Sequence, residues 1–191
     1  MLTAEDILKE MTFKFDAPYG EDRLKELILY IGEKCKDDPT FGAIKLNKIL
    51  YFADFISFIR YGEPVTGVEY MRLGQGPAPK HLLPVSKQMQ AAKEMFIEKR
   101  NYFDREQQRV IPMRDANLNL FKPRDIAMVD EVISALWGEN ADRVSEWSHG
   151  IAWKMFDDKQ SIPYEAAYLS NSWRGEEDED WAQELITKYG W

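Results

Sequence analysis

The sequence predicts an α+β fold that is mainly helical around one buried central helix and carries a small antiparallel β-sheet. Residues 43–61 are apolar around most of a helical circumference, which is typical of a buried helix. Several other segments repeat apolar residues at helical spacing. Two short apolar runs in the middle of the chain flank a polar stretch, and this pattern indicates an antiparallel hairpin.

Three helices are predicted in the first third of the chain. Thr3 can cap a short helix over residues 4–11, and apolar residues at helical spacing predict a second helix over 21–35. The third and most apolar helix covers residues 43–61. Gly62 follows it at the position where helices often end in a left-handed conformation.

The predicted β-structure lies in the middle of the sequence. A strand over residues 68–73 leads into a turn rich in glycine and proline, after which a helix is expected over 80–94. The hairpin strands are expected over 96–103 and 109–113, joined by the polar loop 104–108.

The last third of the chain is predicted to be helical again. Pro123 suits the first position of a helix that reaches residue 136 or 137, and Gly138 suits its end. Asn140 can cap a short helix that runs to Ser148. A terminal helix is expected over 176–189, and its first turn holds a run of five acids.

The composition indicates one globular domain spanning residues 1–191. Apolar residues make up 45% of the chain, and the net charge is −8 with no dense stripe of lysine and arginine, which argues against nucleic acid or an anionic membrane as the main partner. Cys35 is the only cysteine, which excludes an intramolecular disulfide and thiolate metal cages. No run approaches the roughly 20 apolar residues of a membrane span. We therefore expect a soluble cytoplasmic protein.

The common catalytic motifs are missing. The sequence lacks a GxSxG nucleophile elbow, a GxxxxGK[ST] phosphate loop and an HExxH zinc helix. Gly74 and Gly76 form a GxG pair without the third glycine that dinucleotide binding requires. The chain is therefore predicted to be no enzyme and to bind no cofactor and no metal.

Four polar residues remain as candidates. Asp54 interrupts the most apolar helix, so it must reach solvent, accept hydrogen bonds or pair with a cation such as Lys48. A structural polar network, a binding hot spot and a catalytic acid are all open readings. His149 follows a helix end, where its imidazole could interact with the terminal carbonyls. It could instead act as a general base or contact a partner. Lys45 and Lys48 share one helix face and are expected to be a solvated pair.

The segment from Lys45 to Asp54, KLNKILYFAD, resembles the KLxKLLYFAD signature of the Panacea domain, which is found in SocA-like and phage-associated antitoxins. Two later features resemble the same family. They are the Gly76-Pro77 turn before a helix, and the Ser-His pair that ends at His149 with Trp153 downstream. The resemblance covers about residues 24–169.

This resemblance implies an antitoxin that neutralises a co-encoded toxin by binding it directly. One relative resembles an adaptor that delivers its toxin to an ATP-dependent protease. The partners implied are a cognate toxin and such a protease, while a homo-oligomer stays open. The residues expected to form the binding site or the family motif are Lys45, Lys48, Tyr51, Asp54, Gly76, Pro77, His149 and Trp153.

Two other functions stay open from the residues themselves. A hydrolase with Asp54 and His149 as acid and base would need both side chains in one concave, partly wet site. A DNA-binding regulator would need a basic face and a docking helix.

Overall fold

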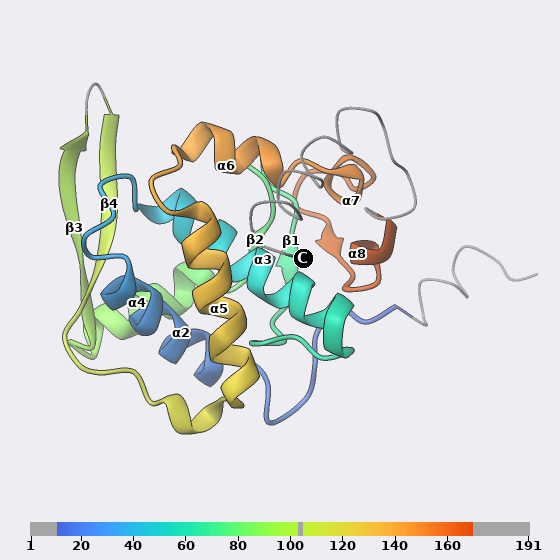
Figure 1. The fold of residues 1–191 in the computed structure, drawn as a ribbon, viewed down its shortest axis with the longest axis horizontal. Coiled ribbons are helices and arrows are strands. Elements are labelled where there is room, and N and C mark those ends of the chain that lie inside the picture. Colours follow the sequence, from blue (N-terminus) through green and yellow to red (C-terminus); the bar gives the residue numbers. More distant parts are fainter. Residues whose placement is uncertain (1–10, 103–104, 170–191) are drawn as a thin grey trace, which may run out of the picture.

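The structure is a computed structural model, and it describes residues 11–102 and 105–169 (Figure 1). Helix α3 (Ala43–Tyr61) lies in the middle of the described part, with α2 (Glu21–Lys34), α5 (Pro123–Leu136), α6 (Ala141–Trp147) and α8 (Ala166–Leu169) packed around it. This arrangement confirms the α+β fold with a buried central helix. The helices predicted over 4–11 and 176–189 lie outside the described residues.

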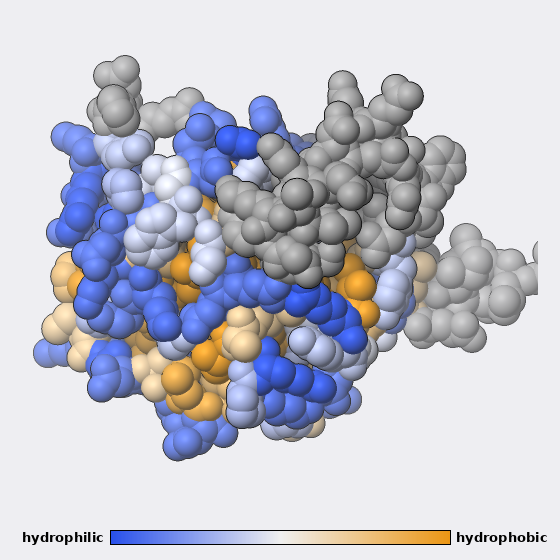
Figure 2. All heavy atoms as spheres, in the orientation of Figure 1, coloured by the Kyte–Doolittle hydropathy of each residue, from blue (hydrophilic) through white to orange (hydrophobic). Residues whose placement is uncertain are grey.

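Helix α3 supplies much of the core because apolar side chains project from most of its surface. Leu46, Ile49, Leu50 and Phe55 are all buried. The helix ends as predicted, since Gly62 adopts a left-handed φ of 71° and its N–H donates to the carbonyl of Phe58 at 2.8 Å. Figure 2 shows a mostly hydrophilic face around smaller hydrophobic areas.

A three-stranded antiparallel sheet connects distant parts of the chain. Strand β1 (Tyr70–Met71) pairs with β2 (Ala78–Pro79) on one side and with β5 (Ser161–Ile162) on the other, so Tyr70 lies opposite both Pro79 and Ile162. The predicted strand over 68–73 is thus shorter in the structure. Residues 72–77 connect β1 to β2, and we call them the β1–β2 loop.

The predicted hairpin exists, but the predicted position of its loop is wrong. Strands β3 (Met95–Tyr102) and β4 (Arg105–Pro112) stay paired from Met95 opposite Pro112 to Tyr102 opposite Arg105. The polar residues 106–108, expected in a loop, therefore belong to a strand. They are polar because this end of the hairpin is largely exposed, so that a strand there needs few apolar side chains.

Helices α5 and α6 begin at their predicted signals, whereas the other helical segments were predicted less well. Helix α4 (Leu82–Ala91) is shorter than the predicted 80–94, and α5 begins with Pro123 at its first turn. The side chain of Asn140 caps α6 by accepting from the Arg143 N–H at 2.8 Å. A 3₁₀ turn, η1 (Leu118–Leu120), precedes α5, and the short helix α7 (Ile151–Lys154) follows α6.

Candidate functional site

Lys45 is buried, although a solvated position was expected. Its Nζ donates to the carboxylate of Asp38 at 2.8 Å and also to the hydroxyl of Thr40, and both charged side chains are only 1% exposed. Asp38 and Thr40 lie between α2 and α3. The expectation fails because this connection folds back over the first turn of α3. The pair anchors the connection to the helix.

Lys48 is also buried, which contradicts the expected solvated pair a second time. Only 2% of the residue is exposed, and its Nζ donates to the carbonyl of Pro77 at 3.0 Å. The β1–β2 loop covers the lysine, which is why helix periodicity alone did not indicate its burial. Loss of hydration lowers the pKa of Lys48 to about 7.

Gly76 lets the β1–β2 loop approach Lys48 closely. Its φ of +95° disfavours other residues, and a Cβ at this position would lie 2.6 Å from Lys48 Nζ and would clash with Ser148 Oγ. From the other side, the Ser145 hydroxyl donates to the carbonyl of Gln75 at 2.8 Å. The loop is therefore held between α3 and α6.

His149 and Trp153 form the outer part of this site. Their rings are stacked with centroids 4.0 Å apart, and the indole N–H of Trp153 donates to the carbonyl of Leu73 at 2.9 Å. The guanidinium carbon of Arg72 lies 4.1 Å from the centroid of the Trp153 ring. Burial lowers the pKa of His149, and the nearby charge of Lys48 lowers it further. This ring is held by the tryptophan and favours its neutral form.

A pocket of about 220 Å³ lies between the β1–β2 loop and α3. Lys48 is part of its wall, and Gly74 and Gln75 are exposed residues of the wall contributed by the loop. The Oδ1 atom of Asn47 is buried and has no hydrogen-bond partner among the described residues. The complete lining is Ile44, Asn47, Lys48, Leu73, Gly74, Gln75, Gly76 and Ala78.

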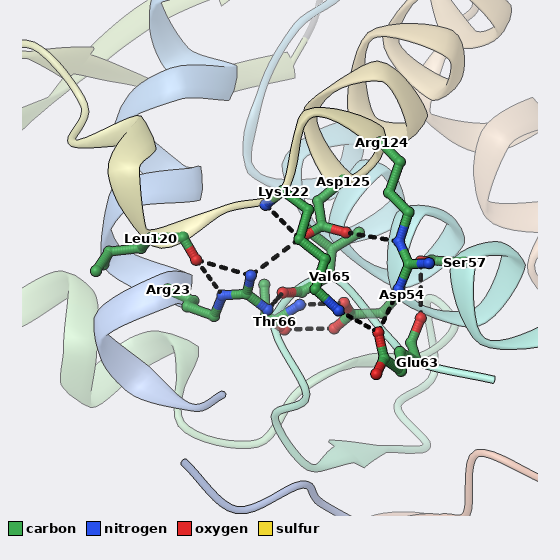
Figure 3. Close-up of polar contacts among 10 residues, drawn as sticks. All are labelled: Arg23, Asp54, Ser57, Glu63, Val65, Thr66, Leu120, Lys122, Arg124 and Asp125. Atoms are coloured by element: carbon green, nitrogen blue, oxygen red, sulfur yellow. Dashed lines mark hydrogen bonds and ion pairs between the residues drawn. The ribbon is translucent and has the colours of Figure 1, made fainter. Parts of the chain in front are cut away.

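Asp54 belongs to a separate, fully buried network. It accepts hydrogen bonds from the Thr66 N–H at 2.5 Å, from the Thr66 hydroxyl, from Tyr70 at 2.9 Å and from Tyr164 at 3.3 Å (Figure 3 shows Asp54 beside Thr66). Solvent exposure, hydrogen bonds and pairing with a cation were the three expected ways to stabilise this carboxylate, and the fold uses hydrogen bonds. Burial raises the pKa of Asp54, and the hydrogen bonds act in the opposite direction.

Two further groups of buried residues stabilise the core near this network. Tyr51 packs among aromatic rings, with its centroid 4.4 Å from that of Phe55 and 5.9 Å from that of Tyr70. Arg23 pairs with Asp125 at 2.9 Å and donates to main-chain carbonyls, thereby linking α2 to the start of α5 (Figure 3).

The structure thus divides the predicted site residues into two sets. Lys48, Gly76, Pro77, His149 and Trp153 come together around the β1–β2 loop, whereas Lys45, Tyr51 and Asp54 lie in the core with partners of their own. In the described residues, the contacts of Asp54 and those of His149 share no member, so the acid–base pair that a hydrolase would need is not assembled.

Several residues at the site gave no signal in the sequence. Arg72, Leu73 and Ser145 contribute through a cation–π contact, a main-chain carbonyl and a hydroxyl bonded to main chain. A main-chain carbonyl has no sequence signature, and the role of Ser145 depends on a loop 70 residues earlier in the chain. For Arg72, its position two residues before Gly74 is the one feature of the sequence that could have placed it at the same site as the glycine-rich turn.

The part of the chain that the structure describes contains no group of three or more histidine, cysteine, aspartate or glutamate residues arranged to hold a metal ion. None of its helices is both long and apolar enough to span a membrane.

Comparison with known proteins agrees with the motifs around this site. Residues 46–154 match the family model described as antitoxin SocA-like, Panacea domain. This range includes most of α3, the β1–β2 loop, α6 and α7, and thus every residue of the set around the loop. No curated protein and no solved structure matches the chain. Since the match covers more than half of the sequence, the chain belongs to the family of SocA-like antitoxins with a Panacea domain.

Proposed function

We propose that this protein is a cytoplasmic antitoxin that neutralises a toxin encoded beside it by direct binding. The observation that carries the proposal is the family match over residues 46–154. We further propose that the toxin binds over the β1–β2 loop and α7, where the family-motif residues gather.

The chemistry of this face supports a protein partner. Trp153 and Arg72 are half-buried, and Met155 is 62% exposed at the end of α7. Aromatic residues, methionine and arginine are the residue types enriched at protein interfaces. Trp153 is held by the stack on His149 and by the bond to Leu73, so an aromatic anchor is already ordered before a partner arrives.

The exposed charges argue against nucleic acid as the main partner. Many surface cations face carboxylates within 4 Å, as Lys80 faces Glu69 and Arg60 faces Glu131, so cations and acids alternate over the surface. A nucleic-acid interface needs cations gathered on one face to neutralise phosphates. The separation of Asp54 from His149 likewise gives the hydrolase reading no support.

The test is to co-express the chain with the product of the gene adjacent to its own. Growth should stop when the neighbouring protein is expressed alone and resume when both are present, and the two should co-purify. Rescue without a complex would contradict direct binding. Repeating the rescue in hosts that lack individual ATP-dependent proteases tests the adaptor role, which requires rescue to fail in one of them.

A further inference from the structure

Lys48 is under-satisfied compared with the other buried cations of the described residues. Arg23 and Lys45 each face a buried aspartate, and Arg109 donates to three main-chain carbonyls. Within the described part of the chain, Lys48 has a single hydrogen bond, to the carbonyl of Pro77, although an ammonium group has three donors. Burying a charge without a counter-charge is costly, so this position needs an explanation beyond folding.

The charges around His149, on the outer side of this site, are mostly positive, although the whole chain is acidic. Arg72 has a buried Nε without a hydrogen-bond partner among the described residues, and the charges that act on His149 include Lys48, Arg72 and Lys154. Glu146 is the one acid among these charges. An anion that reached this region would therefore be attracted.

The pocket beside Lys48 has the size and lining for a carboxylate on a short apolar stem. Its volume of about 220 Å³ exceeds what one acidic side chain requires, and Ile44 and Leu73 supply apolar wall for methylene groups. Asn47 adds a buried amide oxygen that has no hydrogen-bond partner among the described residues, and rotating this amide by 180° would place its N–H donors where Oδ1 now lies.

We propose that this pocket binds a carboxylate group, presented by the partner protein as an aspartate or glutamate side chain that pairs with Lys48. The inference relies on the proposed function for the partner, whereas the carboxylate site itself stands on the pocket and its lysine. An ion pair formed here is shielded from water on the protein side, so losing one member should weaken the complex strongly.

The carboxylate site can be tested without the partner. The full chain is titrated with acetate, with acetamide as the neutral analogue and with inorganic phosphate, while NMR follows the amide resonances of Gly74 and Gly76. We expect saturable shifts with acetate only, retained in Lys87→Met and lost in Lys48→Met and Lys48→Gln. Lys87 is an exposed lysine on α4, outside the pocket and the proposed binding face, and Lys48→Gln keeps a donor for the Pro77 carbonyl. Equal shifts with acetamide, a response to phosphate alone, or binding that survives in both Lys48 variants would overturn the proposal.

The role of the pocket in the complex is tested by the affinity for the partner, in variants that melt like the parent protein. Lys48→Gln should weaken the complex by about tenfold or more. Gly74→Leu should weaken it as well, because Gly74 is an exposed pocket residue where a Cβ would meet no atom within 4 Å, so that the leucine obstructs the pocket without straining the fold. Unchanged affinity in both variants would overturn the role of the pocket in the complex, even if acetate binds. A partner that fails to bind the parent protein would instead refute the proposed function, and the acetate titration would still decide the site.

Discussion

Replacing Lys48 by methionine should remove a pH dependence from the stability of this protein. Burial lowers the pKa of Lys48 from 10.5 to about 7, whereas the unfolded chain keeps the ordinary value. Between these pH values the unfolded chain therefore binds a proton that the folded chain has released. The free energy of unfolding therefore rises with pH across this window. Below the window, the full cost of burying the protonated lysine lowers the free energy of unfolding.

The magnitude follows from the same two pKa values. One pKa unit corresponds to about 1.36 kcal/mol, and Lys48 is half protonated in the folded chain at about pH 7. Its contribution to the free energy of unfolding should then rise by about 2 kcal/mol between about pH 7 and about pH 9. Methionine has a similar length and no charge, so the variant should lack this rise.

Urea unfolding followed by tryptophan fluorescence at both pH values measures the effect as a difference between parent and variant. Cys35 has the opposite influence, because burial raises the pKa of its thiol to about 12 and stability then falls as the unfolded thiol ionises. This contribution is present in both proteins and cancels in the difference. Lys154→Met, at an exposed position, should behave like the parent. If the difference between Lys48→Met and the parent is the same at both pH values, Lys48 is not an unpaired buried cation.

Substitutions at three other residues test the remaining buried contacts. Gly76→Ala should lower the free energy of unfolding by about 2 kcal/mol or more, because its Cβ would lie 2.6 Å from Lys48 Nζ at a positive φ; an unchanged melting temperature would contradict the close approach. Asp54→Ala should cost about 3 kcal/mol or more in urea unfolding, since the Thr66 N–H and the hydroxyls of Thr66 and Tyr70 lose their acceptor, and Asp54→Asn should cost less; the reverse order would refute the network. Trp153→Phe should cost about 1 kcal/mol through the lost bond to the Leu73 carbonyl, and a chemical-denaturation curve identical to that of the parent would show that this bond adds nothing.

The elements of secondary structure were predictable wherever the signal is local. Helix α3 has the predicted bounds, with Gly62 at its end, because an apolar circumference and a C-terminal glycine are properties of neighbouring residues. The caps at Pro123 and Asn140 are equally local. The hairpin prediction was wrong at residues 106–108. These polar residues do not favour a strand by themselves, but pairing with the opposite strand places them in one.

The sequence by itself determined helices α2, α3, α5 and α6, the existence of the hairpin and the family motif, because each depends on residues close together in the chain. Only the tertiary structure decided that Lys45 and Lys48 are buried and that Asp54 and His149 lie in different environments. The physical reason is that burial and hydrogen-bond partners are supplied by segments distant in the chain. The β1–β2 loop closes over Lys48 from 29 residues further along, and no helical period contains that information.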